Sequence, residues 1–231
     1  CEEKSNGKRR SYFNHIQKLI SDGKGNLTLY MKFAYDFHIH SCLSPCGDDD
    51  MTPQNIANMA KIMGYDIIAL TDHNTCLNCP ALMKVGEEIG LTVIPGMELC
   101  TSEEVHIVCL FPSLDDALRF SEHVRSTLPP IKNKPKIFGE QNIRNENDEI
   151  IGMEETLLIT ASGISTMKAV ETVKKYNGIC YPAHIDRDTN GIIAVLGTLP
   201  QDVGFARFEL RDKENADEFS KKYNIKKEQF V

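Results

Sequence analysis

Two histidines separated by a single residue, His38 and His40, close an apolar segment of the chain. Residues i and i+2 of a β-strand point to the same side. The run 31–39 is predicted to be a buried strand, so both imidazoles would leave its end together and could bind one divalent cation or two adjacent ones. An isolated pair of this kind is more commonly satisfied by core carbonyls or solvent, so the metal interpretation needs ligands from elsewhere in the chain.

Three later segments supply such ligands, because each is an apolar run of strand type that ends in an acid or an imidazole. In a barrel of alternating strands and helices these ends converge on one mouth. Five of the seven histidines fall in this pattern, which favours a metal site over satisfied core histidines. The candidate ligands from the later segments are Asp72 and His73, Glu98 with His106, and His184.

Helical segments separate the predicted strands. The first is expected from Pro53 to Gly64, with Thr52 as its N-cap and Pro53 in its first turn. Others are expected over 80–89, closed by Gly90, and over 114–128 and 165–176, and His123 would lie on the outer face of the third. Strands alternating with helices are typical of a parallel barrel or sheet.

Two parts of the chain do not follow this alternation. Within 129–162, the segments 141–143 and 149–151 flank a turn-rich stretch, which predicts a hairpin insertion that could act as a lid or select substrates. Residues 1–30 form an N-terminal extension of unassigned role, with a short helix expected over 12–20. The barrel domain is therefore expected to span 31–231.

Composition narrows the class of protein. A chain of 231 residues suits one α/β domain, and the formal net charge of -7 with a pI of about 5.5 argues against a protein that coats nucleic acid. No stretch approaches the roughly 20 apolar residues of a membrane helix, and no signal peptide is evident, so the cytoplasm is expected. The oligomeric state is not indicated.

The cysteines leave two interpretations open. Cys42 and Cys46 flank the loop after the first histidines, and Cys76 and Cys79 follow His73. Two Cys pairs can hold a structural zinc, although the Cys-x3-Cys spacing around Pro45 is not a common zinc knuckle. The interpretation we favour is that these are reduced thiols packed beneath the loops.

The order of these motifs resembles that of the polymerase and histidinol phosphatase (PHP) family of metal-dependent phosphoesterases, over residues 31–211. The resemblance rests on His38-x-His40, Thr71-Asp72-His73, Pro95-Gly96-x-Glu98, His106 and Pro182-Ala183-His184-x-x-Arg187. It implies a distorted (β/α)7-type barrel with two or three Mn, Zn, Fe or Mg ions at the C-terminal mouth. The ligands that it implies are His38, His40, His73, Glu98, His106 and His184.

The chain departs from the family pattern at two places. The Asp of a Ser-Asp pair that family members commonly carry after the first histidines is not present: Ser44 precedes Pro45 and Cys46, and the acidic run 48–50 lies just beyond. A final Asp-x-His motif does not follow 207–210 either. We therefore expect either a truncated barrel that lacks its last strand or an incomplete site. This 231-residue chain should then bind fewer ions and hydrolyse p-nitrophenyl phosphate feebly compared with a version extended through that motif.

The ligand set predicts hydrolysis of a small phosphomonoester by metal-activated water. Glu98 is the natural bridging ligand. Asp72 is expected either to orient an imidazole or to cap the following loop, and Arg187 either to bind the phosphate or to pair with a neighbouring aspartate on the surface. Two alternatives remain: a phosphodiesterase or exonuclease acting on oligonucleotide ends, and a non-catalytic metal-binding barrel with a regulatory role.

Overall fold

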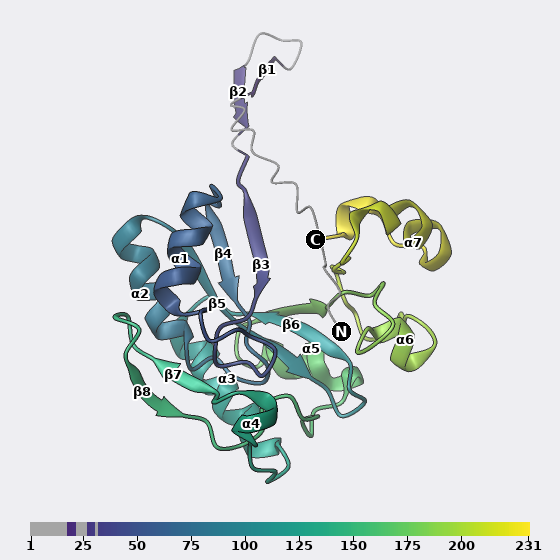
Figure 1. Ribbon diagram of the computed structural model, residues 1–231. Coiled ribbons are helices and arrows are strands. Elements are labelled where there is room, and N and C mark those ends of the chain that lie inside the picture. Colours follow the sequence, from purple (N-terminus) through teal and green to yellow (C-terminus); the bar gives the residue numbers. More distant parts are fainter. Residues whose placement is uncertain (1–17, 22–26, 31) are drawn as a thin grey trace, which may run out of the picture.

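The computed structural model describes residues 18–21, 27–30 and 32–231, and a curled five-stranded sheet forms its centre (Figure 1). The strand order is β3-β4-β5-β6-β9. The first three strands are parallel, whereas β6 is antiparallel to both of its neighbours. The predicted α/β barrel class is confirmed, with the described strands forming half of a barrel. The strands are β3 (Tyr35–Ile39), β4 (Ile67–Leu70), β5 (Thr92–Cys100), β6 (His106–Leu110) and β9 (Ile179–Pro182).

The strict alternation of strands and helices is wrong at one connection. Five residues, 101–105, join β5 directly to β6, and this tight connection makes the two strands antiparallel. A parallel pair would need a crossover of a dozen or more residues. The turn depends on Glu104, whose φ of 66° lies in the left-handed region, and on Thr101, whose hydroxyl accepts a hydrogen bond from the Val105 N–H.

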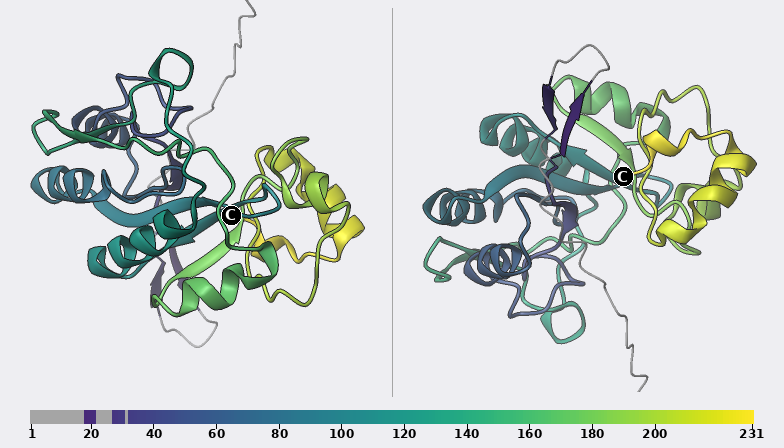
Figure 2. Two further views of the ribbon diagram at one scale, coloured as in Figure 1. Left: turned by 90° about the horizontal axis from the view of Figure 1, so that it is seen from below. Right: turned by 90° about the horizontal axis from the view of Figure 1, so that it is seen from above.

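The four main predicted helices are confirmed, and they pack on the outer face of the sheet (Figure 2). The Thr52 side chain accepts from the Asn55 N–H at the first N-terminus, and Gly90 ends the second helix with a φ of 69°. His123 lies on the third helix, stacked against Tyr176 and only half-buried. The helices are α1 (Pro53–Ile62), α2 (Cys79–Ile89), α3 (Leu114–Thr127) and α5 (Thr166–Lys174).

Side chains alternate between the two faces of the sheet, as the period of two along a strand requires. On β5, Val93, Met97 and Leu99 pack against the helices, whereas Ile94 joins a smaller cluster on the inner face. On β6, Ile107 and Cys109 face the helices, and Val108 and Leu110 face inward. Continuing the alternation places Glu98 and His106 on the inner face, where the sheet curls.

β3 differs from the prediction for 31–39. It begins at Tyr35, and its residues are exposed or half-buried because it is the edge strand of the described sheet. Its register against β4 shifts between Asp36 and Ile39. Such an irregularity locally twists a strand and changes the direction of its side chains.

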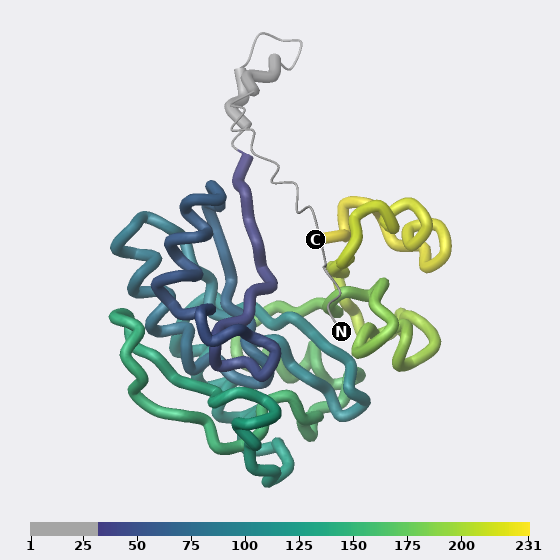
Figure 3. Tube along the Cα trace, in the orientation of Figure 1, coloured from purple at the N-terminus to yellow at the C-terminus, as the bar shows by residue number. Residues whose placement is uncertain are grey.

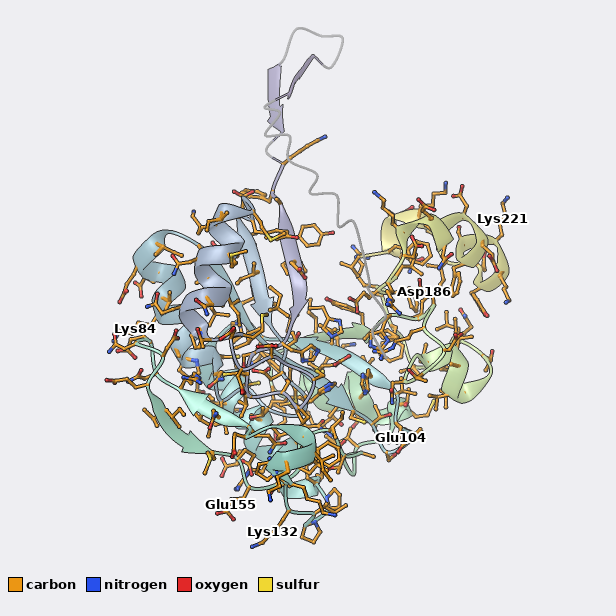
Figure 4. All side chains as sticks on the ribbon, viewed as in Figure 1. Lys84, Glu104, Lys132, Glu155, Asp186 and Lys221 are labelled. Carbon is orange, nitrogen blue, oxygen red and sulfur yellow. The ribbon has the colours of Figure 1, made fainter. Side chains whose placement is uncertain are left out.

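The hairpin predicted within 129–162 is present. β7 (Asn142–Arg144) pairs antiparallel with β8 (Ile150–Met153), and the short α4 (Pro135–Phe138) precedes them. The turn of the hairpin rests on α1 and α2: Asp148 accepts a 2.6 Å hydrogen bond from the Thr52 hydroxyl, and Glu146 pairs with Lys84, which Figure 4 labels at the edge of the molecule.

Past β9 the chain forms a lobe on one side of the sheet, as the tube in Figure 3 traces. Its short helices were not predicted. Within it, residues 208–210 run beside the end of β9, where the Glu209 N–H donates to the Pro182 carbonyl and the Ile185 N–H donates to the Glu209 carbonyl. The elements are α6 (Ile192–Leu196), the 3-10 helix η1 (Lys213–Asn215), α7 (Ala216–Tyr223) and the 3-10 helix η2 (Lys227–Gln229).

The N-terminal extension is described only in part. β1 (Lys18–Ser21) pairs antiparallel with β2 (Leu27–Tyr30), so the helix expected over 12–20 is wrong for its last three residues, and the rest of it, with His15, lies outside the described residues. The proposed boundary between extension and barrel near residue 31 stays a prediction. Over the described residues, the structure contains no helix with the length and apolar character needed to cross a membrane.

Candidate metal centre

The Glu98 carboxylate lies at the centre of five imidazoles. Its Oε1 atom is 3.0–3.2 Å from a ring nitrogen of three histidines, and its Oε2 atom is 3.1 Å from a ring nitrogen of two others. The structure thus places all six residues of the predicted ligand set together. The Oε1 neighbours are His38, His106 and His184, and the Oε2 neighbours are His40 and His73.

The β5–β6 hairpin brings Glu98 and His106 together. Glu98 is the Cα partner of Val108, and Cys100 is the Cα partner of His106. Glu98 and His106 are therefore diagonal neighbours on one face, within reach of each other. Their separation of 3.0 Å from Oε1 to Nδ1 follows directly from this register.

Hydrogen bonds fix the ring orientations of His38, on β3, and of His40, directly after it. His38 Nδ1 lies 2.8 Å from Glu209 Oε2, and His40 Nδ1 lies 3.1 Å from the Ser44 hydroxyl. A carboxylate can only accept, so His38 donates to Glu209 from Nδ1, and Nε2 is the atom through which it would ligate a metal. The Nε2 atoms of His38 and His40 are 3.2 Å apart, and both lie beside Glu98.

His184 reaches the centre through an unusual backbone conformation. Its φ of 31° is in the left-handed region, which costs a non-glycine residue conformational energy. Ala183 already faces the inner cluster, so an extended continuation would turn the next side chain outward. The turn is held by the His184 N–H, which donates to Glu209 Oε2.

Sequence reasoning did not find Glu209. Its carboxylate supports His38 through the ring and His184 through the backbone, although it comes from the C-terminal lobe, more than 20 residues after the last predicted ligand. The signal in the sequence is weak: a single acid in an otherwise unremarkable segment, Phe208-Glu209-Leu210. Only its position beside the end of β9 gives it a role.

The donor atoms fit a divalent metal. The Nδ1 atoms of His73, His106 and His184 are buried and make no hydrogen bond to any described residue, although those of His73 and His106 lie within 3.1 Å of Glu98 oxygens. Buried polar atoms are normally paired, so two unpaired ring nitrogens beside one carboxylate, those of His73 and His106, fit a cation site. Imidazole and carboxylate together suit Zn, Fe or Mn.

The pKa of the Glu98 carboxyl agrees with a divalent metal site. Burial alone would raise the pKa of Glu98, but the imidazoles of His38 and His73 and hydrogen bonds from two further histidines hold it well below its usual range. Burial lowers the pKa of His73 to about 3, so this ring is neutral, as a ligand must be. Burial lowers the pKa of His38 and His40, but Glu98 and Glu209 around His38, and Cys46 and Glu98 around His40, raise it overall, for His40 to about 10. These two rings would therefore have to lose a proton when an ion binds.

Asp72 does not line the pocket; it lies behind it, 1% exposed. Its Oδ1 accepts from the Ser41 N–H and the Ser44 hydroxyl, and its Oδ2 accepts from the Ser41 hydroxyl, all at 2.7 Å. Burial raises the pKa of this carboxyl, against the effect of nearby His40 and of these hydrogen bonds. The geometry supports an indirect role, in which Asp72 holds the loop that supports His40.

Arg187 is exposed and lines the pocket that opens over the metal centre. The pocket has a volume of about 1120 Å³ and is rimmed by two further cations, Arg211 and Lys213. No ion pair between Arg187 and Asp186 or Asp188 occurs among the described side chains. Asp186 instead accepts from the Arg211 and Asp212 N–H groups and so holds the C-terminal lobe beside the pocket (Figure 4).

The cysteines near the pocket differ in their surroundings. Cys76 and Cys79 turn into the core, where both thiols donate to the Gly96 carbonyl. Cys42 is also buried, whereas Cys46 is exposed and lines the pocket. The acidic run 48–50, which could have supplied oxygen ligands, is exposed and does not reach the pocket lining.

The core position of two thiols gives a prediction. The double substitution Cys76→Ser and Cys79→Ser should leave the metal content unchanged, because neither sulfur faces the metal centre, while burial of two hydroxyls should lower stability by about 1–3 kcal/mol each. Plasma emission analysis of the purified variant tests the metal content, and thermal unfolding tests the loss of stability. Loss of one zinc equivalent would instead establish a separate thiolate site.

Comparison with known proteins agrees with this geometry. Residues 36–187, about two thirds of the chain, match the PHP domain family. A Bifidobacterium adolescentis protein assigned as a metal-dependent phosphoesterase has a similar fold, with a TM-score of 0.54 at 17% identity over 84% of this chain and 85% of that one.

Two curated relatives match over shorter stretches. An uncharacterised Methanocaldococcus jannaschii protein is 35% identical over 88 residues, which is 35% of this chain and 51% of that protein. A 5'-3' exoribonuclease of Haemophilus influenzae is 33% identical over 83 residues, covering 35% of this chain and 29% of that protein. The matches thus span about half or less of these relatives.

Proposed function

The chain belongs to the PHP domain family, and from this premise we propose that it is a metal-dependent phosphoesterase that hydrolyses a small phosphomonoester. The observation that carries the proposal is the Glu98 carboxylate, which offers one oxygen to three histidines and the other to two. Such a carboxylate can bridge two ions. Divalent ions held there supply a nucleophile by lowering the pKa of bound water, and neutralise the phosphoryl oxygens.

The ligand set divides between the two oxygens of Glu98. His38, His106 and His184 would hold one ion with Oε1, and His40 and His73 would hold another with Oε2. His38 and His40 present Nε2 because Glu209 and Ser44 engage their Nδ1 atoms. Ligands fixed in this way need little rearrangement when an ion binds.

The charges around the pocket favour phosphate binding at a metal ion. Five carboxylates, three cations and five histidines line it, and divalent ions held among them would add positive charge next to the cations. The carboxylates are Asp36, Glu98, Glu209, Asp212 and Glu214, and the cations are Arg187, Arg211 and Lys213. All three cations come from the chain after β9, which also supplies Glu209, Asp212 and Glu214.

Arg187 is the proposed phosphate ligand of the protein. Its guanidinium can bind two phosphate oxygens at once. Arg187→Ala should lower kcat/KM for a phosphomonoester about 10–100-fold, the equivalent of a charge-assisted hydrogen bond, while the metal content stays at the wild-type value. Arg119→Ala, on the outer surface of α3, is the matched control. Equal activity of the Arg187 and Arg119 variants would remove Arg187 from substrate binding.

A second candidate substrate is the end of an oligonucleotide. The pocket volume of about 1120 Å³ exceeds the roughly 300–1,000 Å³ typical of small-molecule sites, and one relative is a 5'-3' exoribonuclease. The negative net charge argues against a broad nucleic-acid surface, but an end could enter the pocket alone. Arg211 and Lys213 would then contact the second phosphate.

One experiment tests both candidates. The protein is purified without chelator, its metal content is measured, and it is assayed with added Mn against a panel of phosphomonoesters and against a short 5'-phosphorylated RNA. Release of inorganic phosphate from the panel supports the first candidate, and release of mononucleotides supports the second. Bound metal with neither product favours the regulatory barrel, and less than one equivalent of metal contradicts the metal centre itself.

A further inference from the structure

Cys46 is the cysteine whose position the packing of the core does not explain. It lies on the loop between β3 and α1 and is exposed, whereas the other described cysteines are buried or half-buried. Three residues, His40, Cys46 and His73, each offer one possible ligand atom, and these three atoms lie within 4.8 Å of one another. The sulfur therefore lies next to the two histidines that share Glu98 Oε2.

The loop that carries Cys46 is tightly folded. The Ser44 N–H donates to the Ser41 carbonyl, and the Gly47 N–H donates to the Ser44 carbonyl. A Cβ atom at Gly47 would lie 2.0 Å from the Ser41 oxygen, so only glycine fits there. Ser44 is further tied to the neighbouring strand end, because its hydroxyl accepts from the His73 N–H at 3.0 Å.

A second observation points to a ligand at the same place. His73 is 4% exposed, and its Nδ1 atom has no hydrogen-bond partner among the described residues although it lies 3.1 Å from Glu98 Oε2. The Cys46 sulfur groups with His40 and His73, and Glu98 Oε2 lies 3.1 Å from a nitrogen of each of these histidines. These residues offer two nitrogens, one oxygen and one sulfur. Four donors of these types match the tetrahedral coordination that zinc prefers.

We propose that the Cys46 thiolate is the fourth ligand of the ion held by His40, His73 and Glu98 Oε2, so that this position selects zinc or a similarly thiophilic ion over Mg or Mn. The proposal rests on the metal centre and deepens the proposed function. When the ion binds, the Cys46 thiol loses its proton to solvent and a metal–sulfur bond forms. The ligands around Oε1 include no sulfur, so the two positions differ in the metal that they prefer.

Cobalt provides a spectroscopic test that does not depend on activity. Metal-free protein is titrated with Co(II), and a thiolate ligand gives an intense near-ultraviolet charge-transfer band that nitrogen and oxygen ligands do not give. We expect this band in the wild type and its loss in Cys46→Ser. Cys46→Asp should bind Co(II) at wild-type stoichiometry without the band. Cys180→Ser, a half-buried thiol on β9, is the matched control and should keep it.

Alkylation gives an independent readout on the native protein. Iodoacetamide should modify Cys46 in the metal-free protein and not after one or two equivalents of zinc are added, as peptide mass mapping would report. Equal modification of Cys46 with and without bound zinc, or a charge-transfer band that survives in Cys46→Ser, would overturn the proposal. Failure of the wild type to bind any Co(II) or zinc would contradict the metal centre rather than the role of Cys46.

Discussion

Glu98→Gln should purify with less than one equivalent of metal and lose phosphoesterase activity by well over 100-fold. The substitution keeps the shape of the side chain and removes its charge. Loss of a supporting residue around a metal ligand typically costs about 10–100-fold in affinity. Loss of the carboxylate that serves both ion positions should cost more, because every imidazole of the centre contacts it.

The reason is electrostatic as well as geometric. The charge of Glu98 would compensate the charge of cations held by the imidazoles, and its buried position would make this compensation strong. A neutral amide also presents an NH2 group to the histidines on one side, and an amide nitrogen is not a metal ligand. One of the two ion positions therefore loses its oxygen, and the other loses its counter-charge.

The control is Glu104→Gln, an exposed residue of the adjoining β5–β6 turn, which Figure 4 labels. It should retain full metal content and activity. Both variants should show native circular dichroism, so that a loss of metal is not a loss of fold. Wild-type metal content in Glu98→Gln, measured by plasma emission, would mean that the carboxylate is not a ligand and that the imidazoles suffice.

The candidate ligand set was accessible to sequence reasoning because its members lie at or near strand ends, although Glu98 lies two residues before the end of β5 and His106 begins β6. In a βα arrangement an apolar run sets the strand, and the first polar residue after it sets the position at the mouth. This logic placed Asp72, His73 and Glu98 without knowledge of the sheet order. It failed for Glu209, because the segment that carries it is short and has neither the length nor the alternation of a predicted strand.

The four cysteines illustrate a different limit. Sequence spacing joined Cys42 with Cys46 as one pair, but the loop between them turns sharply, so one sulfur is buried and accepts from Arg144 Nε while the other faces the pocket. A spacing cannot report which way a loop turns. The close approach of Gly47 to Ser41, which fixes the turn, is a tertiary property.

The fold was predictable where local signals are strong. Caps at Thr52 and Gly90 marked helix boundaries to within one or two residues. The β5–β6 hairpin was not predicted, since 101–105 lacks the Asn-Gly or Asp-Gly signature of tight hairpins. The antiparallel direction of β6 could therefore not be predicted from the sequence, because it is set by the pairing of β6 with its neighbouring strands. The C-terminal helices are only one or two turns long, too short for a periodic pattern to identify them.

Asp72 connects the fold to the chemistry through a chain of hydrogen bonds that fixes one tautomer. The Ser44 hydroxyl has one proton, and it donates it to Asp72 Oδ1. Toward His40 Nδ1 the same oxygen can then only accept, so His40 donates from Nδ1, and Nε2 is the atom through which it would ligate a metal. Without Asp72, Ser44 is free to donate to His40, which would move the ring proton to Nε2 and block coordination.

Asp72→Ala should therefore weaken zinc binding about 10–100-fold, as measured by chelator competition, even though Asp72 does not line the pocket. It should also lower stability by about 1–3 kcal/mol for each buried donor of Ser41 or Ser44 that loses its acceptor. Asp72→Asn, oriented with its oxygen toward Ser44, keeps the acceptor that the tautomer depends on and should retain more of the affinity.

A double-mutant cycle separates the tautomer effect from general disruption. If Asp72 acts through the Ser44 hydroxyl, Ser44→Ala should weaken zinc binding by a similar factor, and the Asp72→Ala/Ser44→Ala double variant should bind no worse than the weaker single variant. Effects on stability measured on the metal-free proteins should instead accumulate, because the Ser41 donors lose their acceptor regardless of Ser44. Fully additive losses in zinc affinity would show that Asp72 supports the metal centre by a route other than His40. The contacts that remain are those of Ser41, whose backbone N–H donates to Asp72 Oδ1 and whose hydroxyl donates to Oδ2, and which fix the chain directly after His40.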